Sequence, residues 1–515
     1  MSHSFIHARS TPDKPAYIMG ASGETVTYRQ LDERSNQGAH LFRKLGLRVG
    51  DPVAFFIDNH PRYYEILRAA QRSGLRYTCI SSKLSPDEVA YIVKDCGAGV
   101  LIASCALAEV ALRTAPLIEG AALFMVGGDA GPFASFEDAR AGLPTTPIAD
   151  ETAGEAMLYS SGTTGRPKGV IRHVADPNPR IDGPNQQAEL GVARYGFTPD
   201  TVYLSPAPLY HAAPLAWSMA VQTLGGTVVM MERFEAEAAL ALIERYRVTS
   251  AQWVPTHFIR MLKLPEAVRS RYDVSSLIAV FHAAAPCPVE VKSQMMAWWG
   301  PIIHEYYAGT ERNGICGITP EEWLARPGSV GRGINAEVKV CDDAGEPAPP
   351  RTEGLVYFAG GPTFEYLGDP VKTAETRNRY GWTTLGDVGW QDEEGYLYLT
   401  DRKSFMIISG GVNIYPQEIE NLLITHPKVA DVAVIGAPHE EMGEQVVAVV
   451  QPAEDVQPGP ALAEELSDWV RARISHVKAP RRIDFMAELP RQATGKLYKR
   501  LIRDAYWGKG EGAKA

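Results

Sequence analysis

The residues best suited to chemistry lie in one short stretch, residues 159–170, where hydroxyls and glycines precede a single lysine. Its candidate phosphate-binding residues are Ser160, Ser161, Gly162, Thr163, Thr164 and Lys168. Glycine lets a backbone approach an anion closely, and backbone N–H groups beside hydroxyls can form an anion-binding nest. The P-loop of kinases and ATPases has a different spacing, because its lysine directly follows glycine and precedes Ser or Thr. The stretch therefore predicts a phosphate loop of another fold, although a surface turn has a similar composition.

A second candidate cluster is formed by Tyr306, Tyr307, Thr310 and Glu311, which follow a strand-like apolar segment. Tyr307 can stack on a base, and Thr310 can donate a hydrogen bond to a phosphate. The carboxylate of Glu311 is a hard oxygen ligand suited to Mg²⁺. Taken alone, this cluster favours an ordinary surface loop over a binding site.

The elements that must position these residues alternate between helix and strand. Thr27 can cap a helix before residues 31–45, and residues 53–57 form an apolar strand. Ser85 and Glu88 form a capping box at the start of another helix. A second run over residues 200–300 repeats the pattern and includes an apolar strand at residues 277–281. Such alternation indicates a parallel sheet covered by helices.

The pattern of residue types changes in the second half of the chain. After Gly331, short β-type segments between Pro- and Gly-rich turns predict a small β-barrel-like subdomain. Beyond Asp401, the pattern indicates a small α+β domain, which includes a strand over residues 482–485. The predicted fold class is therefore α/β, with a large N-terminal domain of helix-flanked sheets over residues 1–400 and a small mobile domain over residues 401–515, hinged at Asp401.

Composition excludes several classes of protein. The 515 residues carry a formal net charge of -10, which argues against a nucleic-acid partner because such binding relies on basic patches. No apolar stretch reaches the roughly 18 residues of a transmembrane segment, and the N-terminus lacks the pattern of a secretory signal. We therefore expect a cytoplasmic enzyme without a transmembrane segment.

The motifs together resemble one known family. The sequence Tyr-Ser-Ser-Gly-Thr-Thr-Gly-Arg-Pro-Lys-Gly-Val at residues 159–170 is similar over its whole length to the phosphate loop of the adenylate-forming superfamily. That superfamily includes acyl- and aryl-CoA synthetases, luciferases and the adenylation domains of peptide synthetases. Residues 489–497 resemble its C-terminal catalytic-lysine loop, and the intermediate motifs follow in family order. The resemblance covers essentially the whole chain.

The resemblance implies roles for particular residues. The implied catalytic residues are Lys496, Glu311 and His211, and Glu311 is also the implied metal ligand. The implied ATP- or AMP-binding residues are Ser160, Ser161, Gly162, Thr163, Thr164, Lys168, Ala284, Ala285, Pro286, Glu305, Tyr306, Tyr307, Thr310, Asp387 and Arg402. Of these, Ala284, Ala285 and Pro286 match the family's loop beside adenine, and Asp387 and Arg402 match its ribose-binding pair. The implied acyl pocket comprises His211, Trp217, His257, Phe258, His282 and Ala308. Gly410 and Gly411 match the loop that forms one wall of the pantetheine tunnel for coenzyme A.

The chain departs from the family pattern at two places. Ala308 replaces a glycine in the Tyr-Gly-x-Thr-Glu motif, which adds a methyl group near the implied acyl pocket. Ser404 and Phe405 stand where the family often has a lysine and an acidic residue. Lys403 is displaced by one position, so no role is assigned to it.

The resemblance implies an acid–thiol ligase that uses ATP, Mg²⁺ and coenzyme A. A carboxylate attacks the α-phosphate of ATP to give acyl-AMP and pyrophosphate, and a thiol then displaces AMP. Transfer to a carrier-protein thiol and a non-catalytic nucleotide or acyl binder are the alternatives. The expected partner is a small-molecule substrate, a hydrophobic monocarboxylic acid that is fatty or aryl; its identity and the pathway stay open. The oligomeric state also stays open, with a homodimer as one candidate.

Overall fold

The computed structural model describes residues 3–160, 167–172, 179–491 and 497–508. Its contacts divide the chain into two compact units. Unit one comprises Met1–Trp253, Arg260–His282 and Thr363–Thr373, and unit two comprises Val254–Ile259, Ala283–Pro362 and Ala374–Ala515. The predicted domain boundary at Asp401 falls within unit two, so a separate C-terminal domain stays a prediction.

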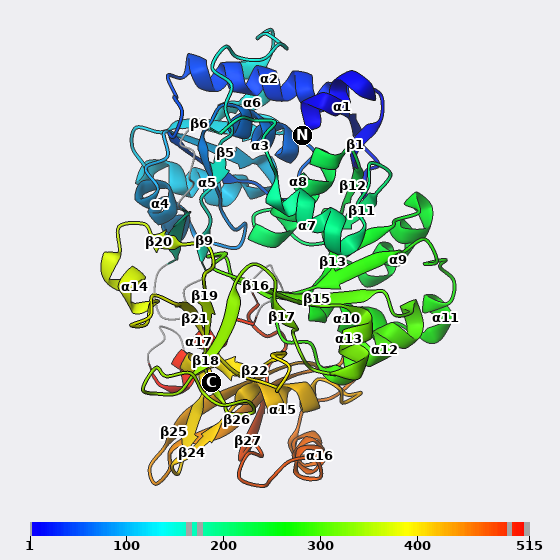
Figure 1. The fold of residues 1–515 in the computed structure, drawn as a ribbon, viewed down its shortest axis with the longest axis vertical. Helices are drawn as coiled ribbons and strands as arrows, with labels where there is room; N and C mark the ends of the chain where they lie inside the picture. Colours follow the sequence, from blue (N-terminus) through cyan, green and yellow to red (C-terminus); the bar gives the residue numbers. More distant parts are fainter. Residues whose placement is uncertain (1–2, 161–166, 173–178, 492–496, 509–515) are drawn as a thin grey trace. The chain divides into compact units, whose positions relative to one another are not determined.

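Unit one begins with a parallel sheet. Its strands are β3 (Pro52–Phe56), β4 (Arg76–Cys79), β5 (Val100–Ser104), β6 (Ala122–Val126), β7 (Ala134–Ser135) and β8 (Glu155–Ala156). They lie in the order β7-β6-β5-β3-β4-β8, and each pairs in parallel with its neighbours. The accompanying helices are α2 (Tyr28–Lys44), α3 (Tyr63–Arg72), α4 (Pro86–Asp95), α5 (Ala108–Thr114) and α6 (Phe136–Arg140). Figure 1 shows these helices around the strands.

Helices cover both faces of this sheet. Leu101 of β5 lies in a buried cluster with side chains of α4 and α5. Phe124 of β6 instead contacts Phe136 of α6, with ring centroids 6.2 Å apart. Burial on both faces explains why the strands read as continuous apolar runs. The predicted caps are confirmed, because Thr27 and Ser85 each form a capping box at the start of α2 and α4.

A second sheet of unit one carries several candidate residues at its ends. Its strands are β1 (Pro15–Met19), β2 (Thr25–Thr27), β11 (Val202–Ser205), β12 (Thr227–Met230), β13 (Ser250–Trp253) and β14 (Ala279–His282). They lie in the order β14-β13-β11-β12-β1-β2, in parallel except for the β1–β2 pair. Its helices are α1 (Ser4–Ser10), α7 (Gln186–Tyr195), α8 (Ala212–Leu224), α9 (Ala236–Tyr246) and α11 (Glu266–Arg269). The helix α10 (Pro255–Leu262) follows β13.

A small antiparallel sheet completes unit one. It consists of β9 (Tyr159–Ser160), β10 (Lys168–Arg172) and β20 (Phe364–Tyr366), in the order β20-β10-β9. Two of its strands therefore flank the predicted phosphate loop, and the third comes from a segment about two hundred residues later in the chain.

Unit two contains two antiparallel arrangements before Asp401. The strands β15 (Ile303–Ala308), β16 (Ile315–Ile318) and β17 (Arg332–Gly333) pair in sequence. The segments predicted as a barrel-like subdomain form β18 (Glu337–Cys341), β19 (Gly354–Ala359), β21 (Thr383–Gln391) and β22 (Leu397–Arg402), in the order β18-β19-β21-β22. The neighbouring helices are α12 (Val289–Trp299) and α13 (Pro320–Ala325). The helix α14 (Pro370–Glu375) begins in unit one and ends in unit two.

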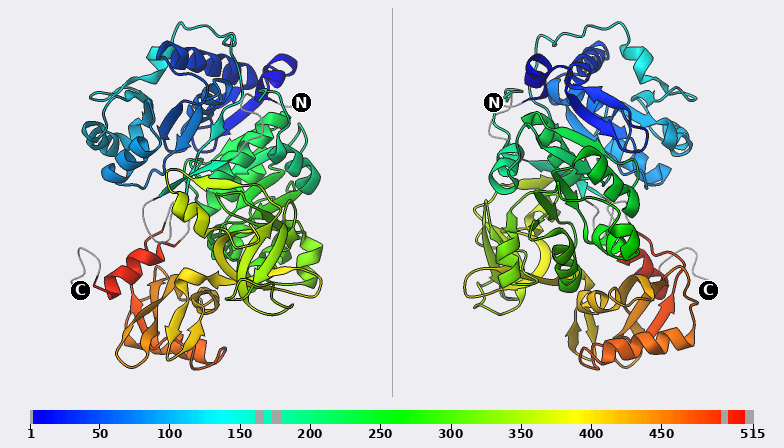
Figure 2. Two further views of the ribbon diagram at one scale, coloured as in Figure 1. Left: turned by 60° about the vertical axis from the view of Figure 1, so that its left-hand side comes forward. Right: turned by 90° about the vertical axis from the view of Figure 1, so that its right-hand side faces the viewer.

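The rest of unit two is an α+β arrangement. Its strands are β23 (Ile407–Ser409), β24 (Val412–Ile414), β25 (Val429–His439), β26 (Gly443–Pro452) and β27 (Arg482–Phe485). The sheet order is β24-β23-β26-β25, with β27 parallel to β26. Its helices are α15 (Pro416–Leu423), α16 (Pro460–Arg471) and α17 (Lys499–Tyr506), which Figure 2 shows against the sheet. The predicted strand over residues 482–485 is confirmed.

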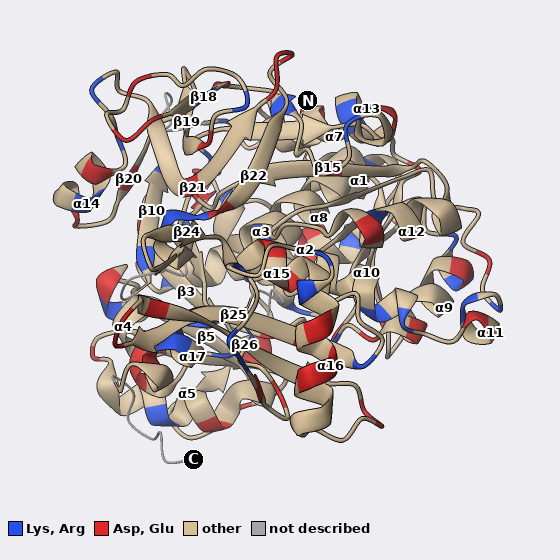
Figure 3. Ribbon diagram, turned by 90° about the horizontal axis from the view of Figure 1, so that it is seen from below, with Lys and Arg blue, Asp and Glu red and all other residues tan. Residues whose placement is uncertain are grey.

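The helix α16 shows how the spacing of apolar residues determines which side chains are buried in the C-terminal part of unit two. Leu462, Leu466 and Val470 recur every four residues and are buried. The exposed side carries acidic residues instead, among them Glu464 and Asp468. Figure 3 shows acidic residues on α16 in red.

Candidate active site

The phosphate loop connects two paired strands. Ser160 of β9 pairs with Lys168 of β10, so both ends of the loop are held in one antiparallel ladder. The Nζ atom of Lys168 donates to Oδ2 of Asp369 at 2.9 Å and lies 5.4 Å from the ring centroid of Tyr366. The predicted binding residues Ser161, Gly162, Thr163 and Thr164 lie outside the described residues.

Three acyl-pocket candidates lie in unit one. His211 is the N-cap residue of α8, and its ring lies 4.4 Å from that of Tyr210. Trp217, one turn and a half further along α8, packs against the ring of Phe281 at 4.9 Å. His282 ends β14 and is fully buried. Trp217 thus lies in an aromatic core, and its role as a pocket residue stays a prediction.

The remaining pocket candidates lie in unit two. His257 and Phe258 belong to the first turns of α10 and are buried, and Phe258 meets Trp299 edge to face at 6.0 Å. Ala308 is the last residue of β15 and is half-buried. The units are not placed relative to one another, so the structure does not bring these residues together with His211.

The predicted adenine loop has an unusual backbone. Ala284 has a φ of 78°, in the left-handed region that costs a side chain about 1–3 kcal/mol. Both Ala284 and Ala285 are exposed, and Pro286 is half-buried. Strain of this kind persists where the surroundings impose it, which is common at ligand-binding loops.

One carboxylate organises the predicted ribose site. Asp387 of β21 is the register partner of Arg402 in β22, and Arg402 Nε donates to Asp387 Oδ1 at 3.0 Å. The hydroxyl of Tyr307 donates to Asp387 Oδ2. A carboxylate oxygen has two lone pairs, so Asp387 can still accept hydrogen bonds from ribose hydroxyls.

Electrostatics fix the protonation states of Tyr307 and Arg402. Burial, followed by the Asp387 charge, raises the pKa of Tyr307 well above its usual value. Burial alone would lower the pKa of Arg402, but Asp387 and Tyr307 outweigh it and the pKa is raised. Tyr307 therefore stays a hydrogen-bond donor and Arg402 stays cationic at neutral pH.

Tyr307 and Glu305 are engaged by neighbours within unit two. The ring of Tyr307 stacks on Phe358, with centroids 5.9 Å apart. The carboxylate of Glu305 forms a buried ion pair with Lys292 of α12, at 2.7 Å. Lys292 also lies over the ring of Trp323, at 4.7 Å. Glu305 thus has a structural partner that accounts for its burial, and nucleotide contact by Glu305 stays a prediction. Tyr306 and Thr310 are half-buried.

The metal-ligand candidate Glu311 lies in a crowded loop. Its residue is 9% exposed. A Cβ atom added at Gly309 would lie 2.8 Å from Glu311 Oε2 and 2.5 Å from Leu385 Cδ1. A side chain at position 309 would therefore force the ends of the Glu311 and Leu385 side chains to move. Among the described residues, no three or more His, Cys, Asp or Glu side chains are grouped as metal ligands. A single hard carboxylate still fits Mg²⁺, which usually takes one or two carboxylates together with substrate phosphates.

Gly410 and Gly411 form the two-residue turn between β23 and β24. Their φ angles are 55° and 81°, and Ser409 pairs with Val412 across the turn. Two positive φ values are typical of a type I′ hairpin, which favours glycine. These glycines therefore have a structural cause as well as the predicted role in a thiol tunnel.

Lys496 lies outside the described residues, but the segments on both sides of it are fixed. The side chain of Arg491 forms an ion pair with Asp431 of β25. The backbone of Arg491 forms an isolated antiparallel β-bridge with Leu497. Lys499, at the start of α17, pairs with the buried Glu420 of α15 at 2.9 Å.

Sequence reasoning missed the partners of the candidate residues. Asp369 lies 201 residues from Lys168, and Lys292 lies 13 residues from Glu305; both are charged residues outside the sequence motifs. The sequence signal for Asp369 is its negative charge, which is opposite to that of Lys168. The 201 residues between them hide the fact that the two side chains meet.

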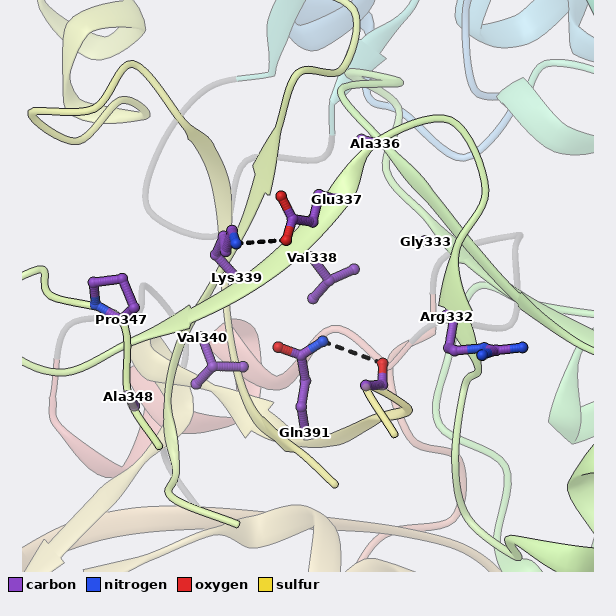
Figure 4. A pocket seen from close by; sticks show the side chains of 11 residues that line it. Arg332, Gly333, Ala336, Glu337, Val338, Lys339, Val340, Pro347, Ala348 and Gln391 are labelled. Carbon is purple, nitrogen blue, oxygen red and sulfur yellow. Dashed lines mark hydrogen bonds and ion pairs between the residues drawn. The ribbon is translucent and has the colours of Figure 1, made fainter. Parts of the chain in front are cut away.

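Unit two also has a surface hollow of about 380 Å³ that includes none of the predicted site residues. Val338 and Val340 project into it in Figure 4, beside Gln391. Two of its charged lining residues, Glu337 and Lys339, pair with each other, and Arg332 also lines it. We assign it no role. Within the part of the chain that the structure describes, no helix is both long and apolar enough to span a bilayer.

Comparison with known proteins places the chain in a family. The family model "AMP-binding enzyme" matches residues 5–365, and "AMP-binding enzyme C-terminal domain" matches residues 418–496. The chain is 32% identical to the fatty acid–[acyl-carrier-protein] ligase ScoC of Streptomyces coeruleorubidus, with 98% of this chain and 95% of that protein covered. It is 33% identical to feruloyl-CoA synthase of an Amycolatopsis species, with 96% of each covered.

A solved structure shares the fold as well. The o-succinylbenzoate CoA synthetase MenE from Bacillus subtilis, in complex with its acyl-adenylate intermediate, aligns with a TM-score of 0.81 and 25% identity. The alignment covers 98% of each chain. The sequence motifs, the fold and these matches agree, and the chain belongs to the AMP-binding enzymes of the adenylate-forming superfamily.

Proposed function

We propose that the protein activates a hydrophobic carboxylic acid with ATP and transfers the acyl group to coenzyme A. The first step gives acyl-AMP and pyrophosphate, and the second gives acyl-CoA and AMP. The observation that carries this proposal is the nearly full-length match to ligases of carboxylic acids, supported by a relative that holds an acyl-adenylate.

The chemistry of the first step explains the types of residue in the site. A carboxylate is already ionised at pH 7, so its attack on the α-phosphate needs no general base. The step requires alignment and neutralisation of developing negative charge. We assign neutralisation to Lys168 at the phosphate loop and to Lys496 at the C-terminal loop. Glu311 would hold Mg²⁺, which neutralises phosphate charge when bound.

The nucleoside is assigned to unit two. Asp387 would accept hydrogen bonds from the ribose hydroxyls while Arg402 and Tyr307 keep its carboxylate in place. The exposed loop of Ala284 and Ala285 would lie against adenine, where small side chains allow a flat ring to approach.

The acceptor is proposed to be free coenzyme A. The hairpin at Gly410 and Gly411 is exposed and carries no side chain that would obstruct a pantetheine arm. ScoC, named as a carrier-protein ligase, makes the carrier-protein thiol the second candidate.

The acid is proposed to be fatty or aryl. The two relatives are named for a fatty acid and for a feruloyl group, and both acids are largely apolar monocarboxylates. The pocket candidates Trp217 and Phe258 are aromatic and buried, which fits such a substrate. A homodimer and a cytoplasmic location stay predictions from the sequence.

The test is pyrophosphate release that depends on added acid. Purified protein with Mg·ATP is given fatty acids of graded length and a series of cinnamic and benzoic acids, first without and then with coenzyme A. We expect release with a subset of acids, and acyl-CoA only when coenzyme A is present. Absence of acid-dependent release across both series would contradict the proposal. Release without thioester formation would favour the carrier protein.

A further inference from the structure

The contact between Lys168 and Asp369 joins the phosphate loop to a segment 201 residues further along the chain. We propose that Asp369 is a positioning residue that holds the Lys168 ammonium in the orientation required for adenylation. This inference rests on the function proposed above, and it adds a residue that no sequence motif assigned.

The backbone of β10 beside Lys168 lies close to the distant strand β20. Leu367 N donates to Gly169 O at 2.8 Å, and Val170 pairs with Tyr366. A Cβ atom at Gly169 would lie 3.1 Å from Tyr159 Cζ and 3.2 Å from Leu367 Cβ. Since contacts this short are tighter than those of most real side chains, Gly169 allows β20 to lie against β10.

A tight turn then brings Asp369 to the ammonium. Asp369 N donates to Tyr366 O at 3.2 Å, and Gly368 has a φ of 65°. A positive φ at the third residue is the mark of a type II turn. The position of Asp369 is therefore set by the turn and the strand, rather than by its attraction to Lys168.

The two oxygens of Asp369 have different partners. Oδ1 accepts a hydrogen bond from Lys372 N at 2.9 Å, which caps the start of α14. Oδ2 accepts from Lys168 Nζ at 2.9 Å. This division matters, because a substitution can preserve the cap and remove only the charge that faces Lys168.

The tether leaves Lys168 able to act. An ammonium has three N–H donors, so two remain for phosphate oxygens when one is held by Asp369. Lysine is a flexible point charge, and fixing one donor restricts its conformations before ATP binds. The hydrogen bond from Lys168 is the main cause that lowers the pKa of Asp369, which keeps the carboxylate ionised at neutral pH.

A competing role for Asp369 makes the opposite prediction. If the carboxylate merely neutralised Lys168 and competed with ATP, its removal would raise the adenylation rate or leave it unchanged. If it positions Lys168, its removal lowers the rate even though the site becomes less negative.

The decisive variant is Asp369→Asn, because asparagine caps helices about as well as aspartate. We expect kcat for acid-dependent pyrophosphate release to fall about tenfold, the kind of loss that a misplaced group causes. The Kd of Mg·ATP, measured by calorimetry, should not rise, since a negative charge has been removed. Asp369→Glu, which keeps the charge, should recover part of the rate.

Two comparisons isolate the effect. Asp13→Asn removes an exposed aspartate that pairs with Arg29 at 3.1 Å, and it should leave both constants unchanged. In a Lys168→Met background, Asp369→Asn should cause no further loss. An unchanged or raised kcat in Asp369→Asn, or a full second loss in the Lys168→Met background, would overturn the inference. Failure of the proposed function is distinct, because wild-type protein would then release no pyrophosphate.

Discussion

At the scale of single residues, the site depends on glycines that leave room for functional groups. Gly309 is the sharpest case, because a methyl group there would meet both Glu311 Oε2 and Leu385 Cδ1 well inside contact distance. The end of each of these flexible side chains would have to move.

We therefore expect Gly309→Ala to displace the Glu311 carboxylate. The Mg²⁺ concentration for half-maximal adenylation should rise about tenfold, because Mg²⁺ loses a well-placed carboxylate ligand. A tenfold change corresponds to a binding free energy of about 1.4 kcal/mol. Gly459→Ala is the matched control, because nothing lies within 4 Å of its added Cβ. An unchanged Mg²⁺ titration in Gly309→Ala would remove Glu311 from the metal site.

The sequence motifs predict the residues that bind the ligand better than they predict the side chains that contact those residues. Asp387 and Arg402 were assigned to the ribose from the resemblance, but their direct contact follows from the register of β21 and β22, which the sequence does not state. The contact between Lys168 and Asp369 could not be predicted from the sequence either, because it depends on the pairing of β10 with β20. Sequence motifs identify groups that meet a ligand, whereas contacts between distant segments arise from tertiary pairing.

At the scale of elements, a buried charge cluster joins α2, α3 and α6. Glu65 is fully buried and accepts from Arg34 at 2.9 Å, Arg62 at 2.7 Å and Arg140 at 2.5 Å. Burial alone would raise the pKa of Glu65, but the three arginines outweigh it and the pKa is lowered. A lowered folded-state pKa means that this stability is complete above the ordinary pKa and is lost as pH falls below it.

We expect Glu65→Gln to lower the free energy of unfolding at pH 7 by about 3–5 kcal/mol, because three cations lose their buried partner. The variant should also lose less stability than wild type between pH 5 and pH 3. Urea unfolding at these pH values measures both effects. Glu33→Gln, an exposed position on α2, serves as the control. Equal acid sensitivity in Glu65→Gln and wild type would contradict this account of the cluster.

The hairpin of β23 and β24 offers a test of the thiol path. Gly411 has a positive φ and no atom within 4 Å of an added Cβ, so asparagine, which tolerates this conformation, should fit. We predict that Gly411→Asn keeps adenylation near the wild-type rate but slows transfer to coenzyme A. Quenched-flow measurement of acyl-AMP and acyl-CoA separates the two steps. Equal slowing of both would assign Gly411 to the fold alone.

Elements were predictable where local signals suffice. Capping boxes at Thr27 and Ser85 located the starts of α2 and α4, and the strand over residues 482–485 was identified from its local pattern. The strand expected at residues 277–281 instead begins at Ala279, because strand ends depend on pairing with β13. The order of strands in each sheet depends on non-local pairing and could not be read from the sequence.

At the scale of the whole molecule, the family matches cover both the large N-terminal part and the C-terminal part that ends at Lys496. The predicted α/β fold class and the enzyme class are confirmed by these matches. The assignment of two successive reactions to one chain requires that some groups act in only one of them. Lys496 is the residue for which this requirement is sharpest, because its charge should be needed only while negative charge develops at the α-phosphate.

The most direct measurement is to time the two half-reactions separately in Lys496→Ala. Acyl-AMP formation from free acid should fall on the order of 10²–10³, as expected for loss of one preorganised donor. Conversion of chemically supplied acyl-AMP to acyl-CoA should stay near the wild-type rate, with an unchanged melting curve. Parallel loss of both half-reactions in a folded variant would contradict the account.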